Sequence, residues 1–158
     1  MIVFPWLNPG CTIRKNIAGR GERMKIAVCL DDQNGMLFCG RRQSKDRYLR
    51  QQLLALAQPN GLWMNGYSAK QFEAGDTICV AEDFLDSAPQ DQWCFVENTD
   101  ILPYKDEIQC VAVYRWNRLY PSDTKFPVEA FCQSWQMIST RTFPGYSHDE
   151  ITEEIYQQ

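Results

Sequence analysis

The sequence predicts an α/β fold in which a mostly parallel central sheet ends in an antiparallel C-terminal hairpin. Short apolar runs alternate with helix-like segments early in the chain, whereas the last two runs are joined directly across Pro144-Gly145. The length of 158 residues, with 44% hydrophobic residues, suits one globular domain and excludes a disordered, collagen-like or coiled-coil chain. No apolar run approaches the ~20 residues that a membrane-spanning helix needs.

The first predicted elements are a strand, a loop and a helix. Residues 25–30 form an apolar run that closes at Asn34-Gly35, so we predict a buried strand that ends in a turn of positive φ. A loop through Arg42 follows. Ser44 is a good N-cap for an amphipathic helix through about Ala57, which the breakers after it bring to an end.

The remaining elements alternate and then pair. Ser68 is the predicted N-cap of a brief second helix. The run at residues 108–114 is almost continuously apolar, which predicts a central strand. Further strands are expected at residues 62–64, 77–80, 93–96, 135–143 and 151–156, and short helices at residues 67–72 and 83–88.

Residues 1–23 are predicted to lie outside the domain, which spans residues 24–158. Met1 to Leu7 is apolar but is interrupted by a proline and followed by its cations, the reverse of a signal peptide. The rest of the segment has no hydrophobic period. Its Gly-Arg-Gly-Glu-Arg tract directly precedes Met24. We therefore hypothesise that Met24 is the native start and that the extension is artefactual read-through; a genuine disordered tail is the alternative.

Charge and composition exclude several classes of function. The formal net charge of −4 disfavours nucleic-acid binding. The seven cysteines form no CxxC pair and several stand in apolar runs, which favours buried thiols in a reducing cytoplasm over a disulfide framework. His148 is the single histidine, so no metal site is predicted. We make no prediction of oligomeric state.

Three stretches of the domain stand out together. They are residues 24–35 (MKIAVCLDDQNG), residues 62–72 (LWMNGYSAKQF), and residues 122–127 (SDTKFP) with Trp135 and residues 145–149 (GYSHD). In register, they resemble dihydrofolate reductase over nearly the whole of residues 24–158. The first is similar to that family's first strand and flexible loop, the second to its second strand and cofactor-side helix, and the third to its closing strands. The resemblance implies an NADPH-dependent reductase of a pterin or a related heterocycle.

The resemblance also implies a catalytic carboxylate on the first helix, which binds the ring and assists its protonation. Asp46 stands at the matching position, and Ala27 and Tyr114 match the walls of the substrate cleft. A carboxylate is suited to pair with two ring N–H groups in a dry cleft. An acid in the first turn of a helix also complements the helix dipole without any catalytic role, and that alternative stays open.

On the cofactor side, the NADPH phosphates of this family are bound by a Gly-Arg-x-Thr/Ser turn. The matching residues here are Asn65, Gly66 and Ser68, which become the predicted cofactor contacts. Gly66 stands where the family has its arginine, so bidentate pairing with phosphate is lost. Residues 97–100 (ENTD) place two carboxylates where the family has adjacent glycines next to the pyrophosphate.

These departures support a second hypothesis, a non-catalytic ligand-binding or regulatory protein on the same fold. Its small-molecule ligand would be an anion held by a basic helix face, although such a cluster is also typical of a solvated surface. The cluster comprises Arg41, Arg42, Lys45, Arg47 and Arg50.

Two hydrolytic alternatives find less support. A dinuclear metallo-hydrolase needs several histidines. A Ser-His-Asp hydrolase pairing His148 with Asp149 lacks the G-x-S-x-G elbow, so we interpret His148 as structural.

Overall fold

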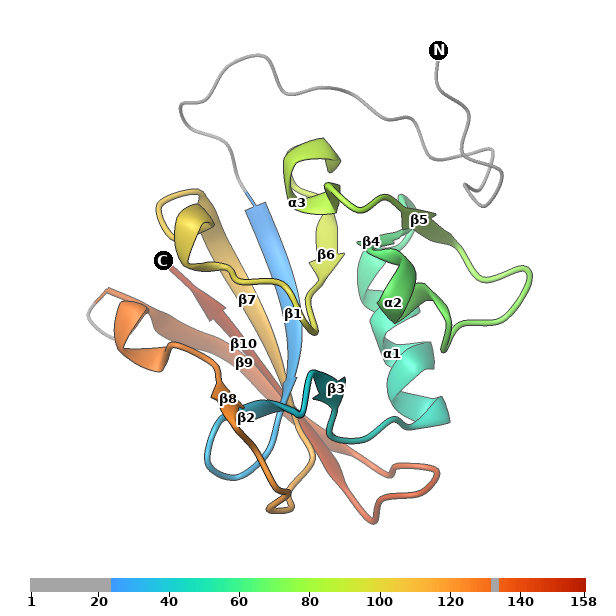
Figure 1. The fold of residues 1–158 in the computed structure, drawn as a ribbon, viewed down its shortest axis with the longest axis vertical. Helices are drawn as coiled ribbons and strands as arrows, with labels where there is room; N and C mark the ends of the chain where they lie inside the picture. The colour runs from blue at the N-terminus through green and yellow to red at the C-terminus, as the bar shows by residue number, and fades with distance from the viewer. Residues whose placement is uncertain (1–23, 132–133) are drawn as a thin grey trace.

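The computed structural model describes residues 24–131 and 134–158, and its centre is a seven-stranded sheet (Figure 1). The predicted extension, residues 1–23, lies outside the described residues. In spatial order the strands are β5 (Ile78–Val80), β4 (Leu62–Met64), β6 (Trp93–Phe95), β1 (Met24–Leu30), β7 (Ile108–Arg115), β10 (Ile151–Gln157) and β9 (Gln136–Phe143). The first five strands of this spatial order, from β5 through β4, β6 and β1 to β7, pair in parallel. Strand β10 is antiparallel to both β7 and β9. The predicted fold class is confirmed.

Helices cover both faces of this sheet. α1 (Arg47–Ala57) packs on one face, and α2 (Gly66–Ala69) follows β4 near the β5 edge (Figure 1). The opposite face is covered by α3 (Phe84–Ser87) and by two single 3-10 turns, η1 (Leu102–Tyr104) and η2 (Val128–Ala130).

A small second sheet replaces the loop that was predicted before the first helix. It consists of β3 (Arg41–Arg42), β2 (Gly35–Phe38) and β8 (Thr124–Lys125), all antiparallel. The turn into β2 is fixed by Asp31, whose Oδ1 accepts a hydrogen bond from the Gly35 amide at 2.7 Å. A Cβ on Gly35 would lie 2.7 Å from Asp31 Oδ2, so only glycine fits there.

The core follows from the alternation of side chains along β1. Ile26 and Val28 point to the face covered by α3, whereas Ala27 points to the face covered by α1. On that second face, Leu49 and Leu53 of α1, four residues apart, are both buried. The sheet is therefore buried on both sides, as its continuous apolar strands predict.

The structure corrects both predicted helix caps. Asp46, not Ser44, caps α1: its Oδ1 accepts hydrogen bonds from the amides of Tyr48 at 2.9 Å and Leu49 at 3.2 Å. Asn65 rather than Ser68 caps α2. Serine, aspartate and asparagine are equally good N-caps, so the sequence pattern does not distinguish between such close neighbours.

The cysteines only partly follow the expectation of buried thiols. Cys94 is fully buried, and this burial raises the pKa of its thiol to about 12. Cys39, by contrast, is exposed, and Cys79 is disulfide-bonded, which the sequence analysis did not expect. Within the described residues, no helix is long and apolar enough to cross a membrane.

The packing of α1 yields a stability test. Leu53 is 1% exposed, so Leu53→Ala should lower the free energy of unfolding by about 2–5 kcal/mol, because it leaves a cavity beneath the helix. Leu54→Ala is the matched control, since Leu54 lies in the same helix but is only half-buried. Urea unfolding should show a clearly smaller loss for the control, and equal losses would contradict this packing.

Candidate functional site

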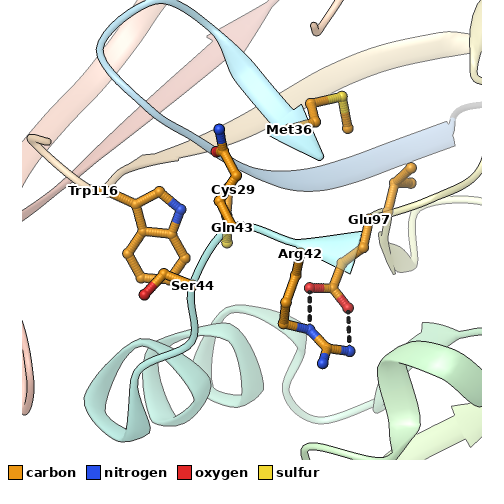
Figure 2. Close-up of a pocket in the computed structure, with 8 residues that line it drawn as sticks. Cys29, Met36, Arg42, Gln43, Ser44, Glu97 and Trp116 are labelled. Carbon is orange, nitrogen blue, oxygen red and sulfur yellow. Dashed lines mark hydrogen bonds and ion pairs between the residues drawn. The ribbon is translucent and has the colours of Figure 1, made fainter. Parts of the chain in front are cut away.

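The carboxyl ends of β1, β6 and β7 meet the β2–β3 hairpin around one small cavity (Figure 2). Ligands of parallel α/β sheets bind at this end of the strands. The cavity measures only about 10 Å³, which is roughly the space of one water molecule. It is lined by Cys29, Met36, Arg42, Gln43, Ser44, Val96, Glu97 and Trp116.

An ion pair fills the space beside this cavity. Arg42 Nε donates to Glu97 Oε2 at 2.9 Å, and Arg42 Nη2 donates to Glu97 Oε1 at 3.2 Å (Figure 2). The guanidinium also lies 4.3 Å from the centre of the Tyr67 ring, and Gln71 Nε2 donates to the same carboxylate at 3.0 Å. Burial alone would lower the pKa of Arg42, but hydrogen bonding to Glu97 and its charge outweigh that effect and raise it. The pair is therefore charged and bidentate.

Asp46 holds the turn between β9 and β10 against the start of α1. Its Oδ1 accepts from the Tyr146 amide at 3.0 Å, and its Oδ2 accepts from the Ser147 amide at 2.8 Å. His148 Nδ1 lies 2.9 Å from Oδ2. Burial would raise the pKa of Asp46, but these hydrogen bonds and the one from the Leu49 amide hold it well below its usual range. Both carboxylate oxygens are thus engaged by donors of the protein itself.

His148 lies between this carboxylate and two hydroxyl groups. Its Nε2 is 3.0 Å from Ser44 Oγ and 2.9 Å from the Tyr120 hydroxyl. Trp116 stacks on the imidazole, with ring centres 4.6 Å apart and planes at 26°. The His148 side chain is only 5% exposed. An ionised carboxylate only accepts hydrogen bonds, so Nδ1 of His148 carries a proton, and Nε2 faces the two hydroxyls.

The sequence analysis did not anticipate this cluster. In the sequence, His148 was weighed with the adjacent Asp149, in a hydrolase alternative that found little support, whereas the structure places it against Asp46, 102 residues away. No local pattern reports a contact of such separation. A weaker signal was present: Ser44 and Asp46, both good N-cap residues, stand two residues apart before the predicted helix.

The predicted cleft walls lie inside the core. Ala27 and Tyr114 are both 0% exposed on the α1 side of the sheet, and neither lines the cavity beside Arg42. The Tyr114 hydroxyl donates to Glu153 Oε2 at 2.7 Å, and burial together with that carboxylate raises its pKa. Their role in substrate binding stays a prediction.

The predicted cofactor contacts at the start of α2 already have partners. Asn65 Oδ1 accepts from the Ser68 amide at 3.0 Å, and the Gly66 amide donates to Glu82 Oε2 at 2.8 Å. Asn65 Nδ2 donates to Asn98 Oδ1 at 2.8 Å. The Ser68 hydroxyl is buried without a partner. A carboxylate therefore occupies the helix start where the resemblance implies a phosphate.

Residues 24–131 and 134–158 contain no cluster of three His, Cys, Asp or Glu side chains that could hold a metal ion.

Comparison with known proteins supports the fold alone. No family model and no curated protein sequence matches the chain. Among solved structures, it is similar to dihydrofolate reductase from Enterococcus faecalis complexed with NADP(H) and RAB-propyl, at a TM-score of 0.58 and 11% sequence identity. The similarity covers 85% of this chain and 95% of that one. The chain thus has a dihydrofolate reductase-like fold.

The Asp46 contacts predict how stability depends on pH. Asp46→Ser keeps an N-cap oxygen but leaves the Tyr146 and Ser147 amides and His148 Nδ1 without the carboxylate that they contact, so we expect a loss of about 3–5 kcal/mol at pH 7. Folding lowers the pKa of Asp46, so the carboxylate contributes its full stabilisation at pH values above its pKa in the unfolded chain, which is about 4. This contribution is lost progressively as the pH falls below that value. The gap between wild type and Asp46→Ser in urea unfolding should therefore narrow from pH 7 to pH 3.

The control for this measurement is Asp32→Ser, because Asp32 is exposed. It should lose little stability at pH 7. A gap for Asp46→Ser that stays constant over the whole pH range would contradict the hydrogen-bonded, ionised carboxylate.

Proposed function

We propose that this chain is a ligand-binding protein on a dihydrofolate reductase-like fold, that its ligand is a small anion with a flat ring, and that it does not use NADPH. The observation that carries the proposal is the bidentate pair of Arg42 and Glu97 beside a cavity of about 10 Å³. A heterocycle and a nicotinamide ring need hundreds of cubic ångströms at this edge of the sheet. The pair leaves space for neither.

The residues at the start of α2 do not fit NADPH. The similar Enterococcus faecalis enzyme is complexed with NADP(H), which makes this cofactor the natural candidate. Here Glu82 accepts from the Gly66 amide, and Glu97 is buried near the end of β6. The Glu82 carboxylate therefore stands where a pyrophosphate would bring further negative charge, and Arg42, which could attract the pyrophosphate, is already paired with Glu97; both effects disfavour binding.

A hollow of about 480 Å³ over the β2–β3 hairpin is better suited to an anion. It is lined by Phe38, Cys39, Arg41, Arg42, Gln43, Tyr120 and Pro121. Arg41 is exposed, and no ion pair holds it among the described residues.

Further groups around this hollow set its charge and shape. The Arg118 guanidinium lies 5.9 Å from the centre of the Tyr120 ring and adds a second positive charge. Asp123 approaches from the other side, accepting from the Cys39 amide at 2.9 Å. Phe38 is 46% exposed and offers a flat apolar surface. Arginine and aromatic groups together recognise a planar anion by charge and by stacking.

An NADPH-dependent pterin reductase is the second candidate. It is favoured by the fold and by the buried position of Asp46 at the start of α1, which matches the family's catalytic carboxylate in sequence. This reading requires the Arg42–Glu97 pair to open and the Asp46 carboxylate to exchange its protein donors for substrate. A cytoplasmic location is compatible with both candidate functions and stays a prediction.

Thermal shift measurements distinguish these two functions. Benzoate at about 100 times its Kd should raise the Tm by about 8–10 °C, because it binds only the folded state, whereas uncharged benzamide should not. Arg41→Ala should abolish the benzoate shift. Lys105→Ala removes the same charge from an exposed site at the opposite end of the sheet and should keep it.

The same measurement with NADPH and with folic acid tests the second candidate. Neither compound should raise the Tm of the wild-type protein. A rise with NADPH or folic acid, while benzoate has no effect, would overturn the proposed function and favour the reductase.

A further inference from the structure

Three side chains from distant parts of the chain form a continuous line of hydrogen bonds: Ser44, His148 and Asp46. Ser44 Oγ lies 3.0 Å from His148 Nε2, and His148 Nδ1 lies 2.9 Å from Asp46 Oδ2. We propose that this relay activates Ser44 as a nucleophile toward esters with a small acyl group. This hydrolytic activity goes beyond the proposed binding function and does not depend on it.

The relay meets the geometric requirements of an activated serine. A nucleophile needs a base within hydrogen-bond reach, and the base needs a third group that fixes its orientation and tautomer. Asp46 supplies that group, since its carboxylate accepts the Nδ1 proton and leaves Nε2 to accept from Ser44. Trp116 holds the ring from one face by stacking at 4.6 Å. The imidazole is thus fixed on three sides.

The carboxylate is itself rigidly held. The amides of Tyr146 and Ser147 donate to it from the β9–β10 turn, and the amides of Tyr48 and Leu49 donate from α1. Its side chain is fully buried. Four backbone donors keep the group ionised and immobile, so it stabilises the imidazolium that forms when His148 takes a proton.

The surroundings of the relay restrict the substrate. Ser44 borders the cavity of about 10 Å³ that it shares with Arg42 and Gln43 (Figure 2), which holds only about one water molecule, so the acyl group has to lie mainly outside it and must be among the smallest. His148 also lines an open hollow of about 510 Å³, together with Trp116 and Arg118. That hollow is large enough for the alcohol part of an ester, which makes small acetyl or formyl esters the substrate class.

The reaction balances with water as its only co-reactant. Ser44 Oγ forms a bond to the acyl carbon while its proton passes to His148 Nε2. The C–O bond to the alcohol breaks, and the departing oxygen takes that proton. Water then adds to the acyl carbon and gives a proton to Nε2. The bond between the acyl carbon and Oγ breaks, the proton returns to Oγ, and the carboxylic acid leaves.

The Tyr120 hydroxyl competes with Ser44 Oγ for the same nitrogen of His148. This hydroxyl lies 2.9 Å from Nε2 and 3.5 Å from Ser44 Oγ. The test must therefore identify which oxygen reacts. A fluorophosphonate does so, because it forms a phosphorus–oxygen bond to an activated hydroxyl with loss of fluoride.

The experiment labels the native wild-type protein with a fluorophosphonate and locates the adduct by peptide mass spectrometry. We expect the adduct on Ser44 and none on Ser139, an exposed serine of β9. Ser44→Ala should abolish labelling, while Ser139→Ala should label as wild type does. An adduct on Tyr120 alone, or no adduct on Ser44 in the folded wild-type protein, would overturn the proposal.

Turnover provides a second readout that a purely structural cluster would not affect. Hydrolysis of p-nitrophenyl acetate should fall to the background rate in Ser44→Ala. In His148→Gln it should fall about 100-fold, which is the size of a general-base contribution. Wild-type rates equal to those of Ser44→Ala would contradict the proposal, whether or not His148→Gln folds.

Discussion

The carboxylate of Asp46 joins two parts of the chain that are 102 residues apart. It is the N-cap of α1. It also binds the β9–β10 turn through the three consecutive residues Tyr146, Ser147 and His148. That turn comes so close that a Cβ on Gly145 would lie 3.0 Å from Asp46 Oδ2 and 2.5 Å from the His148 carbonyl oxygen. The position of His148, and with it the line of contacts to Ser44, depends on this one group.

A second polar contact, between Arg42 and Glu97, underlies the proposed choice of ligand. The dihydrofolate reductase-like sheet brings the ends of β1, β6 and β7 together, but Arg42 and Glu97 meet across the space between them. A bidentate pair of this kind is costly to separate, because the buried Glu97 carboxylate would lose its compensating charge. The same scaffold therefore presents a closed cleft on one side of the β2–β3 hairpin and an open, arginine-bearing hollow on the other. Function follows from these side chains and not from the fold.

Sequence patterns predicted the architecture because strands and helices are encoded locally. The apolar run of β7 predicted a central strand, and the Pro144-Gly145 turn predicted the closing hairpin. Asp46 was singled out from its position, but its partners were not, since the contact with His148 joins residues that no window of the sequence contains together. The β2–β3 hairpin was likewise missed, because its strands are too short to show a period. Long-range polar contacts decide this site, and single-sequence periodicity does not report them.

The arrangement of the whole cluster depends most on Asp46 being bound within the protein by His148 instead of facing a ligand. His148 is the single histidine, so an NMR spectrum of protein with ¹⁵N-labelled histidine contains one imidazole without ambiguity. We predict a slowly exchanging, strongly downfield Nδ1 proton and a nuclear Overhauser contact between this imidazole and the stacked Trp116 ring. A ring whose N–H protons exchange rapidly with water, without contact to Trp116, would contradict this arrangement.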